Sequence, residues 1–342
     1  MRRDLMRTRS LGPIIDPNLL QEGLYRIKKA VVTIDGCEYR LTDYVPTTRL
    51  ICKGGYGAVY RLGVKVGNEF IPSNEVIKVQ INVPNLKVER ESKITELAGF
   101  MVEPCFFAYR EDLYYTHYSF IPMEYVPGEC WIDIVNRDRT NPYLSIGTHL
   151  RIMEKVLEDY INNIYKKGIE YRDAKLDNTI VDIDSLQDPV CVRGARNVDF
   201  GLSTLVGMKK TVSDINCGSK DYVAPEIVKG IDSGAKREVY SYGICFRLEL
   251  HDGALESIID ADRMMPESKK RLLSLVEKMT ASEPEDRPEP EAVLATLREL
   301  QEDRFYTSIK AMHQTGLYAH PNRPQNEEVY PKNEGKRVAS IK

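Results

Sequence analysis

Residues 171–178 read YRDAKLDN and bring together three side chains that phosphoryl transfer requires. Asp173 is a carboxylate that can orient an attacking hydroxyl, and Lys175, two residues later, is a cation that can offset negative charge. Asn178 adds an amide oxygen, a ligand type that suits a hard cation such as Mg²⁺. An ordinary polar loop between a helix and a strand would not explain this order of residue types. The segment therefore predicts a catalytic loop.

A second acidic residue follows at the end of an apolar run. Residues 198–201 read VDFG, so Asp199 is followed by an aromatic residue and by a glycine whose backbone can change conformation. Asn178 and Asp199 together offer oxygen ligands of the kind that Mg²⁺ prefers. We therefore predict these two residues as the metal ligands.

A glycine-rich turn and a lysine precede both loops in the chain. Gly54, Gly55 and Gly57, followed by Val59, lie between two β-like runs, where backbone N–H groups could approach phosphates closely. Such turns are more often structural, so this one is weak evidence alone. Lys78 stands in the strand-like run EVIKVQ. It is either the solvent-facing half of an alternating pattern or a cation that points at the phosphates.

The elements that must position these residues change in character along the chain. Before residue 126 the sequence is rich in β-forming runs, with one helix predicted over 87–100 and a hairpin around Asp35-Gly36. After Pro127-Gly128, amphipathic patterns predict the long helices 148–168, 236–250, 267–282 and 290–312. Strands followed by helices predict an α+β chain of two lobes.

Taken in order, these motifs resemble the signature set of the eukaryotic-type protein kinases, in its serine/threonine class. The resemblance covers about residues 44–301 and includes APE at 224–226. It implies the bilobal protein-kinase-like fold, with a β-rich N-lobe at about 44–126 and a helical C-lobe at about 127–304. Residues 1–43 would then be an N-terminal extension with the hairpin. Residues 305–342 would be a tail that we predict to be disordered.

The resemblance also implies roles for single residues. Asp173 would be the catalytic base, while Lys78 and Lys175 would stabilise charge on the transferred group. Lys78 would pair with a glutamate of the first helix, for which Glu91 is a better match than Glu96. The predicted ATP- and Mg²⁺-binding set comprises Gly54, Gly55, Gly57, Val59, Lys78, Glu91, Asn178, Asp199, the backbone of Glu124 and Val126, and Glu129 at the ribose.

Two further contacts are implied by the same resemblance. Ser219 resembles the hydroxyl that ties the substrate-binding segment to Asp173 and Lys175. Glu226 and Arg287 resemble a buried ion pair that braces the helical lobe, a structural role rather than a catalytic one.

Several positions depart from the family pattern. Cys52 replaces the first glycine of the turn, Tyr171 replaces a histidine, and Glu238 stands where an aspartate normally anchors the catalytic loop. More residues than usual in the family lie between Asn178 and Asp199, and the additional residues, 182–195, predict an exposed hairpin. The stretch 250–271 is short, although the family normally builds substrate-docking elements there.

The activation segment, residues 201–224 by the resemblance, leaves two possibilities open. Asp214 could satisfy Arg172 without any modification, which predicts a constitutively competent kinase. Alternatively, Thr211 or Ser213 receives an activating phosphate.

The 342 residues carry a net charge of -3, with 42% hydrophobic and 29% charged residues. This balance predicts a globular chain without attraction to nucleic acid or anionic membranes, and no basic stripe is present. Seven scattered cysteines without a C-x-x-C pair predict a reducing compartment, and we expect a cytoplasmic protein. No apolar run is long enough to span a bilayer. Composition leaves the oligomeric state open.

The predicted function is ATP- and Mg²⁺-dependent transfer of the γ-phosphoryl group to serine or threonine hydroxyls of protein substrates. The main alternative is a pseudokinase that acts as a binding scaffold. Such chains typically lack the strand lysine, the catalytic aspartate or the metal aspartate, whereas Lys78, Asp173 and Asp199 are all present. A kinase of small molecules or lipids is a second alternative. The segment with APE and Ser219 argues against it, because that segment shapes a peptide-binding surface.

Overall fold

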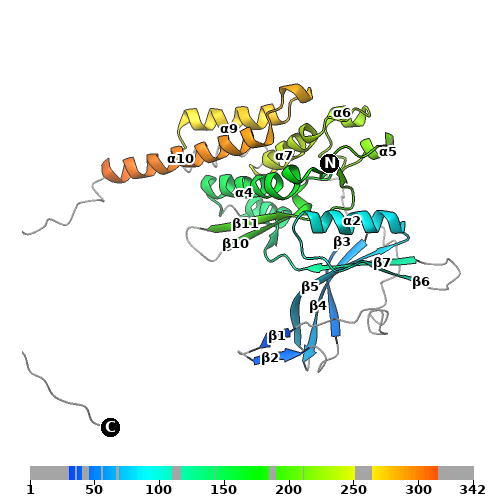
Figure 1. Ribbon diagram of the computed structural model, residues 1–342. Helices are drawn as coiled ribbons and strands as arrows, with labels where there is room; N and C mark the ends of the chain where they lie inside the picture. The colour runs from blue at the N-terminus through cyan, green and yellow to red at the C-terminus, as the bar shows by residue number, and fades with distance from the viewer. Residues whose placement is uncertain are drawn as a thin grey trace, which may run out of the picture.

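The computed structural model describes residues 31–34, 37–40, 46–54, 57–66, 69–109, 117–141, 143–184, 190–210, 212–250 and 264–314. These residues form a β-sheet lobe and a helical lobe, joined after strand β7 (Figure 1). The predicted class, α+β with two lobes, is confirmed. In the part of the chain that the structure describes, no helix is both long enough and apolar enough to cross a membrane.

The N-lobe is built on a five-stranded antiparallel sheet with the strand order β3-β4-β5-β7-β6. Alternate residues of β5 face opposite sides: Ile77 and Val79 are fully buried beside Phe120, whereas Lys78 and Gln80 face the helix α2. The strands are β3 (Pro46–Gly54), β4 (Gly57–Val66), β5 (Glu69–Ile81), β6 (Phe106–Tyr109) and β7 (His117–Glu124). A separate hairpin, β1 (Val31–Ile34) with β2 (Cys37–Arg40), pairs where the sequence predicts one.

Helix α2 (Asn85–Leu97) lies across one face of this sheet (Figure 1). It begins directly after Pro84 and buries Val88 and Ile94. The sequence pattern also places Leu97 among the apolar positions, but 43% of this residue is exposed. The helix ends before Gly99, whose φ of +92° few other residues adopt.

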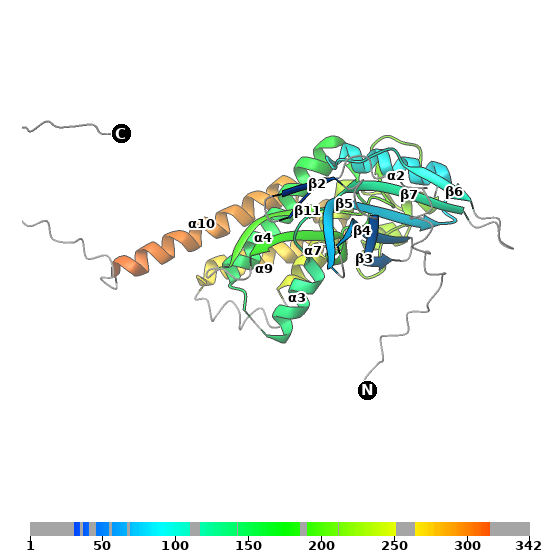
Figure 2. The same ribbon diagram turned by 90° about the horizontal axis from the view of Figure 1, so that it is seen from below.

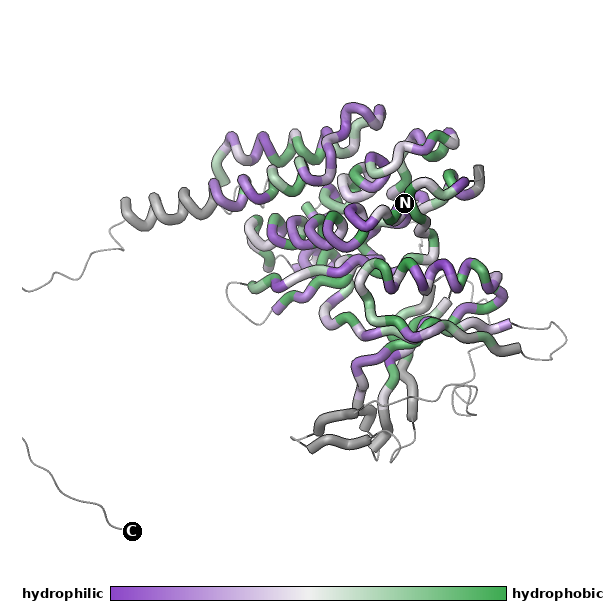
Figure 3. The backbone as a smooth tube through the Cα atoms, viewed as in Figure 1, coloured by the Kyte–Doolittle hydropathy of each residue, from purple (hydrophilic) through white to green (hydrophobic). Residues whose placement is uncertain are grey.

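The described part of the C-lobe contains the predicted long helices and three that the sequence did not predict, α3 and the short α5 and α6. Its helices are α3 (Trp131–Thr140), α4 (Ile146–Asp159), α5 (Val212–Ile215), α6 (Pro225–Val228), α7 (Ala235–Glu249), α9 (Pro266–Met279) and α10 (Pro290–Gln314). A π turn (Tyr160–Ile164) and a 3-10 turn (Tyr165–Lys167) continue α4, and further 3-10 turns cover Leu176–Asn178 and Pro284–Asp286. Polar and apolar stretches alternate along α9 and along α10 up to residue 303, as expected of helices with one buried face (Figure 3).

The end of the last helix corrects one prediction. Helix α10 continues to Gln314, and Figure 2 shows it reaching beyond the other helices. Residues 305–314, assigned to a disordered tail from the sequence, are therefore helical. Proline and asparagine residues, which discourage helix, gather only further along the chain. Residues 315–342 lie outside the described part.

Short strands carry the loops of the site: β8 (Glu129–Cys130), β9 (Ile169–Glu170), β10 (Thr179–Asp184), β11 (Cys191–Asn197) and β12 (Thr204–Leu205). Strands β10 and β11 pair antiparallel and lie beside α4 (Figure 1), so the predicted hairpin is present. Its tip, residues 185–189, lies outside the described residues, as does most of the short stretch 250–271.

A buried polar network joins four elements of the C-lobe. The backbone and side-chain N–H groups of Asn197 donate to Asp159 of α4, at 2.8 and 2.9 Å. Its side-chain oxygen accepts from Tyr242 of α7 (3.0 Å) and from Thr179 of β10 (3.2 Å). Because all four residues are buried, each polar group depends on the others for its hydrogen bonds.

The predicted brace of the helical lobe is present. The Arg287 guanidinium donates to both carboxylate oxygens of Glu226, at 2.6 and 2.7 Å, and both residues are buried. A bidentate pair of this kind fixes the start of α6 against the loop before α10.

Candidate active site

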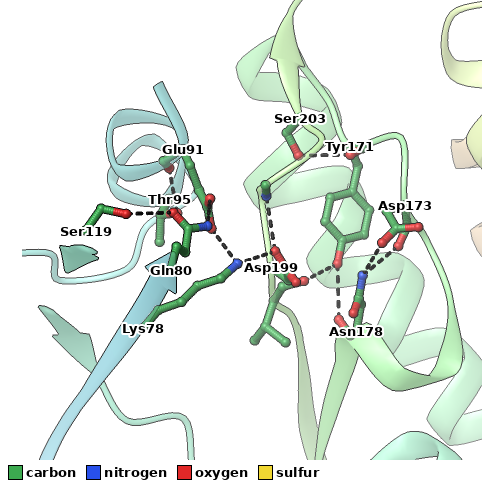
Figure 4. A network of polar contacts seen from close by, with 12 residues as sticks. Lys78, Gln80, Glu91, Thr95, Ser119, Tyr171, Asp173, Asn178, Asp199 and Ser203 are labelled. Carbon is green, nitrogen blue, oxygen red and sulfur yellow. Dashed lines mark hydrogen bonds and ion pairs between the residues drawn. The ribbon is translucent and has the colours of Figure 1, made fainter. Parts of the chain in front are cut away.

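Lys78 lies where the two lobes meet, between two carboxylates (Figure 4). Its Nζ atom is 2.6 Å from Glu91 Oε1 on α2 and 2.7 Å from Asp199 Oδ1 in the C-lobe. Burial disfavours the Lys78 charge, but the two carboxylates outweigh burial and raise its pKa. Lys78 is only 6% exposed, so the alternative that this lysine faces solvent is wrong.

The glutamate that pairs with Lys78 is Glu91, as the sequence favours over Glu96, which is exposed. Gln80, two residues after Lys78 on β5, donates to the second Glu91 oxygen at 2.8 Å. Two alternate residues of one strand thus hold one helix residue, and this fixes α2 against the sheet. The role of Gln80 was not found from the sequence, because one glutamine in a strand gives no signal.

Three residues contact the Asp173 carboxylate. Asn178 Nδ2 donates to Asp173 Oδ2 at 2.9 Å (Figure 4). Ser219 donates to Asp173 Oδ1 at 2.8 Å. Lys175 Nζ lies 3.1 Å from Oδ2 and also donates to the Ser219 hydroxyl at 3.0 Å. The contacts of Ser219 with Asp173 and Lys175 are those that the family resemblance implies.

Two oxygen atoms beside this loop are open to a metal ion. Because the Asn178 side-chain nitrogen is bound to Asp173, the side-chain oxygen Oδ1 is left without a partner among the described residues. Asp199 accepts from Lys78 and from the Gly201 N–H through Oδ1 alone, which leaves Oδ2 open. Burial disfavours the Asp199 anion, but the Lys78 charge outweighs it and lowers the pKa of this carboxyl. Two hard oxygen donors, one of them charged, fit Mg²⁺.

Tyr171 joins the catalytic loop to the segment that carries Asp199. Its buried hydroxyl donates to the carbonyl oxygens of Asn178 and Val198, and its ring lies 5.4 Å from that of Phe200. Phe200 in turn meets Phe100, just after α2, at 5.8 Å. Burial raises the Tyr171 pKa well above its usual range, so this hydroxyl stays a donor.

Strands β3 and β4 flank the glycine-rich segment: Gly54 pairs with Gly57, and the exposed Cys52 pairs with Val59. A Cβ at Gly57 would lie 2.4 Å from the carbonyl oxygen of Val79, so strand packing by itself requires glycine there. Val59 lies opposite Lys78 in the β4–β5 register, which places strand β4 directly beside the lysine. Gly55 lies outside the described residues.

The segment that joins the lobes limits how an adenine could bind. The Glu124 N–H donates to the Met101 carbonyl at 2.9 Å, so Glu124 can offer a ligand only its carbonyl oxygen. No backbone hydrogen bond of Val126 is found among the described residues. Glu129, expected at the ribose, forms an ion pair with Arg137 of α3 at 2.7 Å and has one carboxylate oxygen left.

Glu238 of α7 holds the catalytic loop, in the place of the aspartate usual in the family. Its Oε1 accepts the Arg172 N–H at 2.7 Å, and its Oε2 is buried with no hydrogen-bond partner in the part of the chain that the structure describes. Burial, with a smaller contribution from the Glu170 charge, raises the pKa of Glu238 to about 7, against the opposing effects of the Arg237 charge and of the Arg172 N–H and charge. The Glu238 charge in turn adds to burial in raising the pKa of Tyr160, Tyr171 and Tyr242.

This raised pKa predicts a pH-dependent stability. The folded state holds the Glu238 proton more tightly than the unfolded state, so wild-type stability is full below about pH 4.5 and falls as the pH rises to about 7. Glu238→Gln removes this dependence and should be more stable than wild type at pH 8, by up to about 3 kcal/mol. Urea unfolding at pH 5, 6, 7 and 8 measures the difference. Glu238→Asp, which keeps a carboxylic acid, is the control. A difference in unfolding free energy between Glu238→Gln and wild type that stays constant from pH 5 to pH 8 would contradict the prediction.

Comparisons with known proteins identify the family. The protein kinase domain model matches residues 46–297, and the chain belongs to this family. It is 26% identical over 237 residues to protein kinase C zeta type of Oryctolagus cuniculus, covering 66% of this chain and 36% of that protein. It is 25% identical over 196 residues to probable serine/threonine-protein kinase 2 of Plasmodium falciparum, covering 57% and 35%. The chain thus spans about a third of the length of these relatives.

Proposed function

We propose that the chain is an active kinase that transfers the γ-phosphoryl group of ATP, with Mg²⁺, to serine or threonine hydroxyls of proteins. The observation that carries the proposal is the position of Lys78, 2.6 Å from Glu91 and 2.7 Å from Asp199. This contact requires α2 and the Asp199 segment to be in place together. A pseudokinase scaffold would have no need to keep all three charges.

The chain's own residues account for the chemistry as follows. Asp173 accepts or orients the proton of the attacking hydroxyl, and Ser219 and Asn178 fix its two oxygens. Lys78 and Lys175 stabilise the charge that develops on the phosphoryl group. Asn178 and Asp199 would hold Mg²⁺, which supplies positive charge at the phosphates when it is bound.

The nucleotide would lie between the β3–β4 hairpin and the segment after β7. Gly54, Gly55, Gly57 and Val59 would cover the phosphates, while the Glu124 carbonyl and the Val126 backbone would meet the adenine. The free oxygen of Glu129 would reach the ribose, although Arg137 competes for this carboxylate. Protein is the preferred substrate class because Ser219, which contacts Asp173, lies on the segment that leads to Ala224-Pro225-Glu226. We also propose that the chain acts in the cytoplasm.

The test is transfer of label from γ-labelled ATP to a basic protein and to the chain itself, with and without excess chelator. We expect label on serine and threonine in wild type, lost with chelator and in the Asp173→Ala control. Wild type that binds ATP in a thermal-shift assay yet transfers no label would refute the kinase proposal and favour the scaffold. Label on tyrosine alone would refute the serine/threonine assignment.

A further inference from the structure

Arg237, near the start of α7, is a buried arginine whose hydrogen-bond partners are two backbone carbonyls and, more weakly, the Cys217 sulfur. Only 4% of the residue is exposed. Its guanidinium donates to the carbonyl oxygen of Cys217 at 2.6 Å and to that of Ile215 at 3.2 Å. Because a buried charge is stable only when its hydrogen bonds are made, this side chain depends on the segment that it holds.

Ser241, one helical turn after Arg237, contacts the same segment. Its hydroxyl donates to the Tyr222 carbonyl at 2.9 Å. Residues four apart lie on one face of a helix, so Arg237 and Ser241 hold the two ends of residues 217–222 from the same face of α7.

Backbone geometry inside this stretch also requires a close fit. Gly218 has a φ of +125°, and a Cβ there would lie 2.7 Å from the Val223 side chain and 3.0 Å from the Arg172 carbonyl oxygen. The stretch is therefore pressed against the catalytic loop. Ser219, the next residue, is the one that contacts Asp173.

We propose that Arg237 is a positioning residue that fixes the substrate-binding segment, residues 214–223, against the catalytic loop. It acts through the Cys217 carbonyl on Ser219, and through Ser219 on Asp173. The adjacent Glu238 holds the catalytic loop itself through the Arg172 N–H. Two consecutive residues of α7 thus set the relative position of both loops. The inference rests on the proposed kinase function only for its kinetic consequences.

The first test needs no catalysis. Hydrogen–deuterium exchange of the full chain should show faster exchange at residues 214–223 in Arg237→Met than in wild type, by about tenfold, with α9 and α10 unchanged. Arg237→Lys, which keeps one charged donor, should recover part of the protection. Arg271→Met is the matched control, because Arg271 pairs with Glu299 and Asp303 on α10, away from the site. Exchange that is unchanged at residues 214–223, or raised evenly over the helical lobe, would overturn the proposal.

The second test is kinetic. Loss of charge-assisted hydrogen bonds should lower kcat/KM for the protein acceptor about ten- to hundredfold in Arg237→Met, with the KM for ATP within about twofold of wild type. The effect should not add to that of Ser219→Ala, because both changes act through one segment. Equal losses toward ATP and acceptor, or full additivity with Ser219→Ala, would overturn the positioning role. Inactive wild type would instead refute the kinase proposal, and the exchange experiment would still decide the role of Arg237.

Discussion

Asp199→Asn is expected to lower phosphoryl transfer by about 10³-fold while the chain stays folded. The substitution keeps the size of the side chain but removes the negative charge that lies 2.7 Å from Lys78 Nζ. It also removes the anionic member of the proposed metal pair, whose other member, Asn178, is neutral. ATP affinity, which should rise with Mg²⁺ in wild type, should lose most of this dependence in the variant. Initial rates and nucleotide binding over a Mg²⁺ series measure both effects.

Asp182→Asn is the matched control for this variant. Asp182 pairs with Arg193 on the exposed β10–β11 hairpin, so the same chemical change there should leave transfer at the wild-type rate. An Asp199→Asn protein that keeps more than about a tenth of wild-type activity, with its Mg²⁺ dependence intact, would show that the metal is held elsewhere.

Asp173→Ala is expected to lower transfer by about 10²–10⁴-fold through a different route. Asp173 shares a C-lobe loop with Lys175 and Asn178, accepts from Ser219 of the substrate-binding segment, and contacts neither Lys78 nor Glu91. Asn178 Nδ2 also donates to the backbone carbonyl oxygen of Asp173 at 3.0 Å, a hydrogen bond that the variant keeps, so the proposed metal ligand stays in place. Nucleotide affinity and its Mg²⁺ dependence should therefore stay close to wild type, unlike in Asp199→Asn. Single-turnover rates beside ATP titrations make the distinction.

If Asp173→Ala lost ATP affinity by as large a factor as it lost transfer rate, Asp173 would not act on the acceptor hydroxyl alone. Glu285→Ala, in the 3-10 turn before α10, is the control for the loss of an acidic side chain in the C-lobe. It should change neither quantity.

The sequence predicted the parts of the site that lie close together in the chain. Asp173, Lys175 and Asn178 share one loop, so their spacing alone indicates their chemistry. The choice of Glu91 over Glu96 came from the family resemblance, and the ion pair with Lys78 agrees with it.

Contacts that depend on tertiary packing were not predictable in the same way. Gln80 and Arg237 act on residues 11 and 20 positions away, and neither residue belongs to a recognisable motif. Helix α3 was missed because its ten residues, WIDIVNRDRT, give a short and mixed pattern. The helical pattern placed the end of α10 at residue 312, within two residues of Gln314, whereas the division into domains assigned residues 305–314 to the tail. Composition indicates where a helix is discouraged, not where it stops.

The buried network around Asn197 has a consequence for the order in which the C-lobe folds. Its hydrogen bonds join residues 38, 45 and 18 positions apart, on α4, α7 and β10. No pair of these elements can satisfy Asn197 alone, so the entropy of closing several loops must be lost before any of the network's bonds is complete. The N-lobe hairpins pair strands that are neighbours in the sequence, so their hydrogen bonds can form after only a short loop has closed. We expect the C-lobe core to form late and in a single cooperative step, after the N-lobe hairpins have begun to pair.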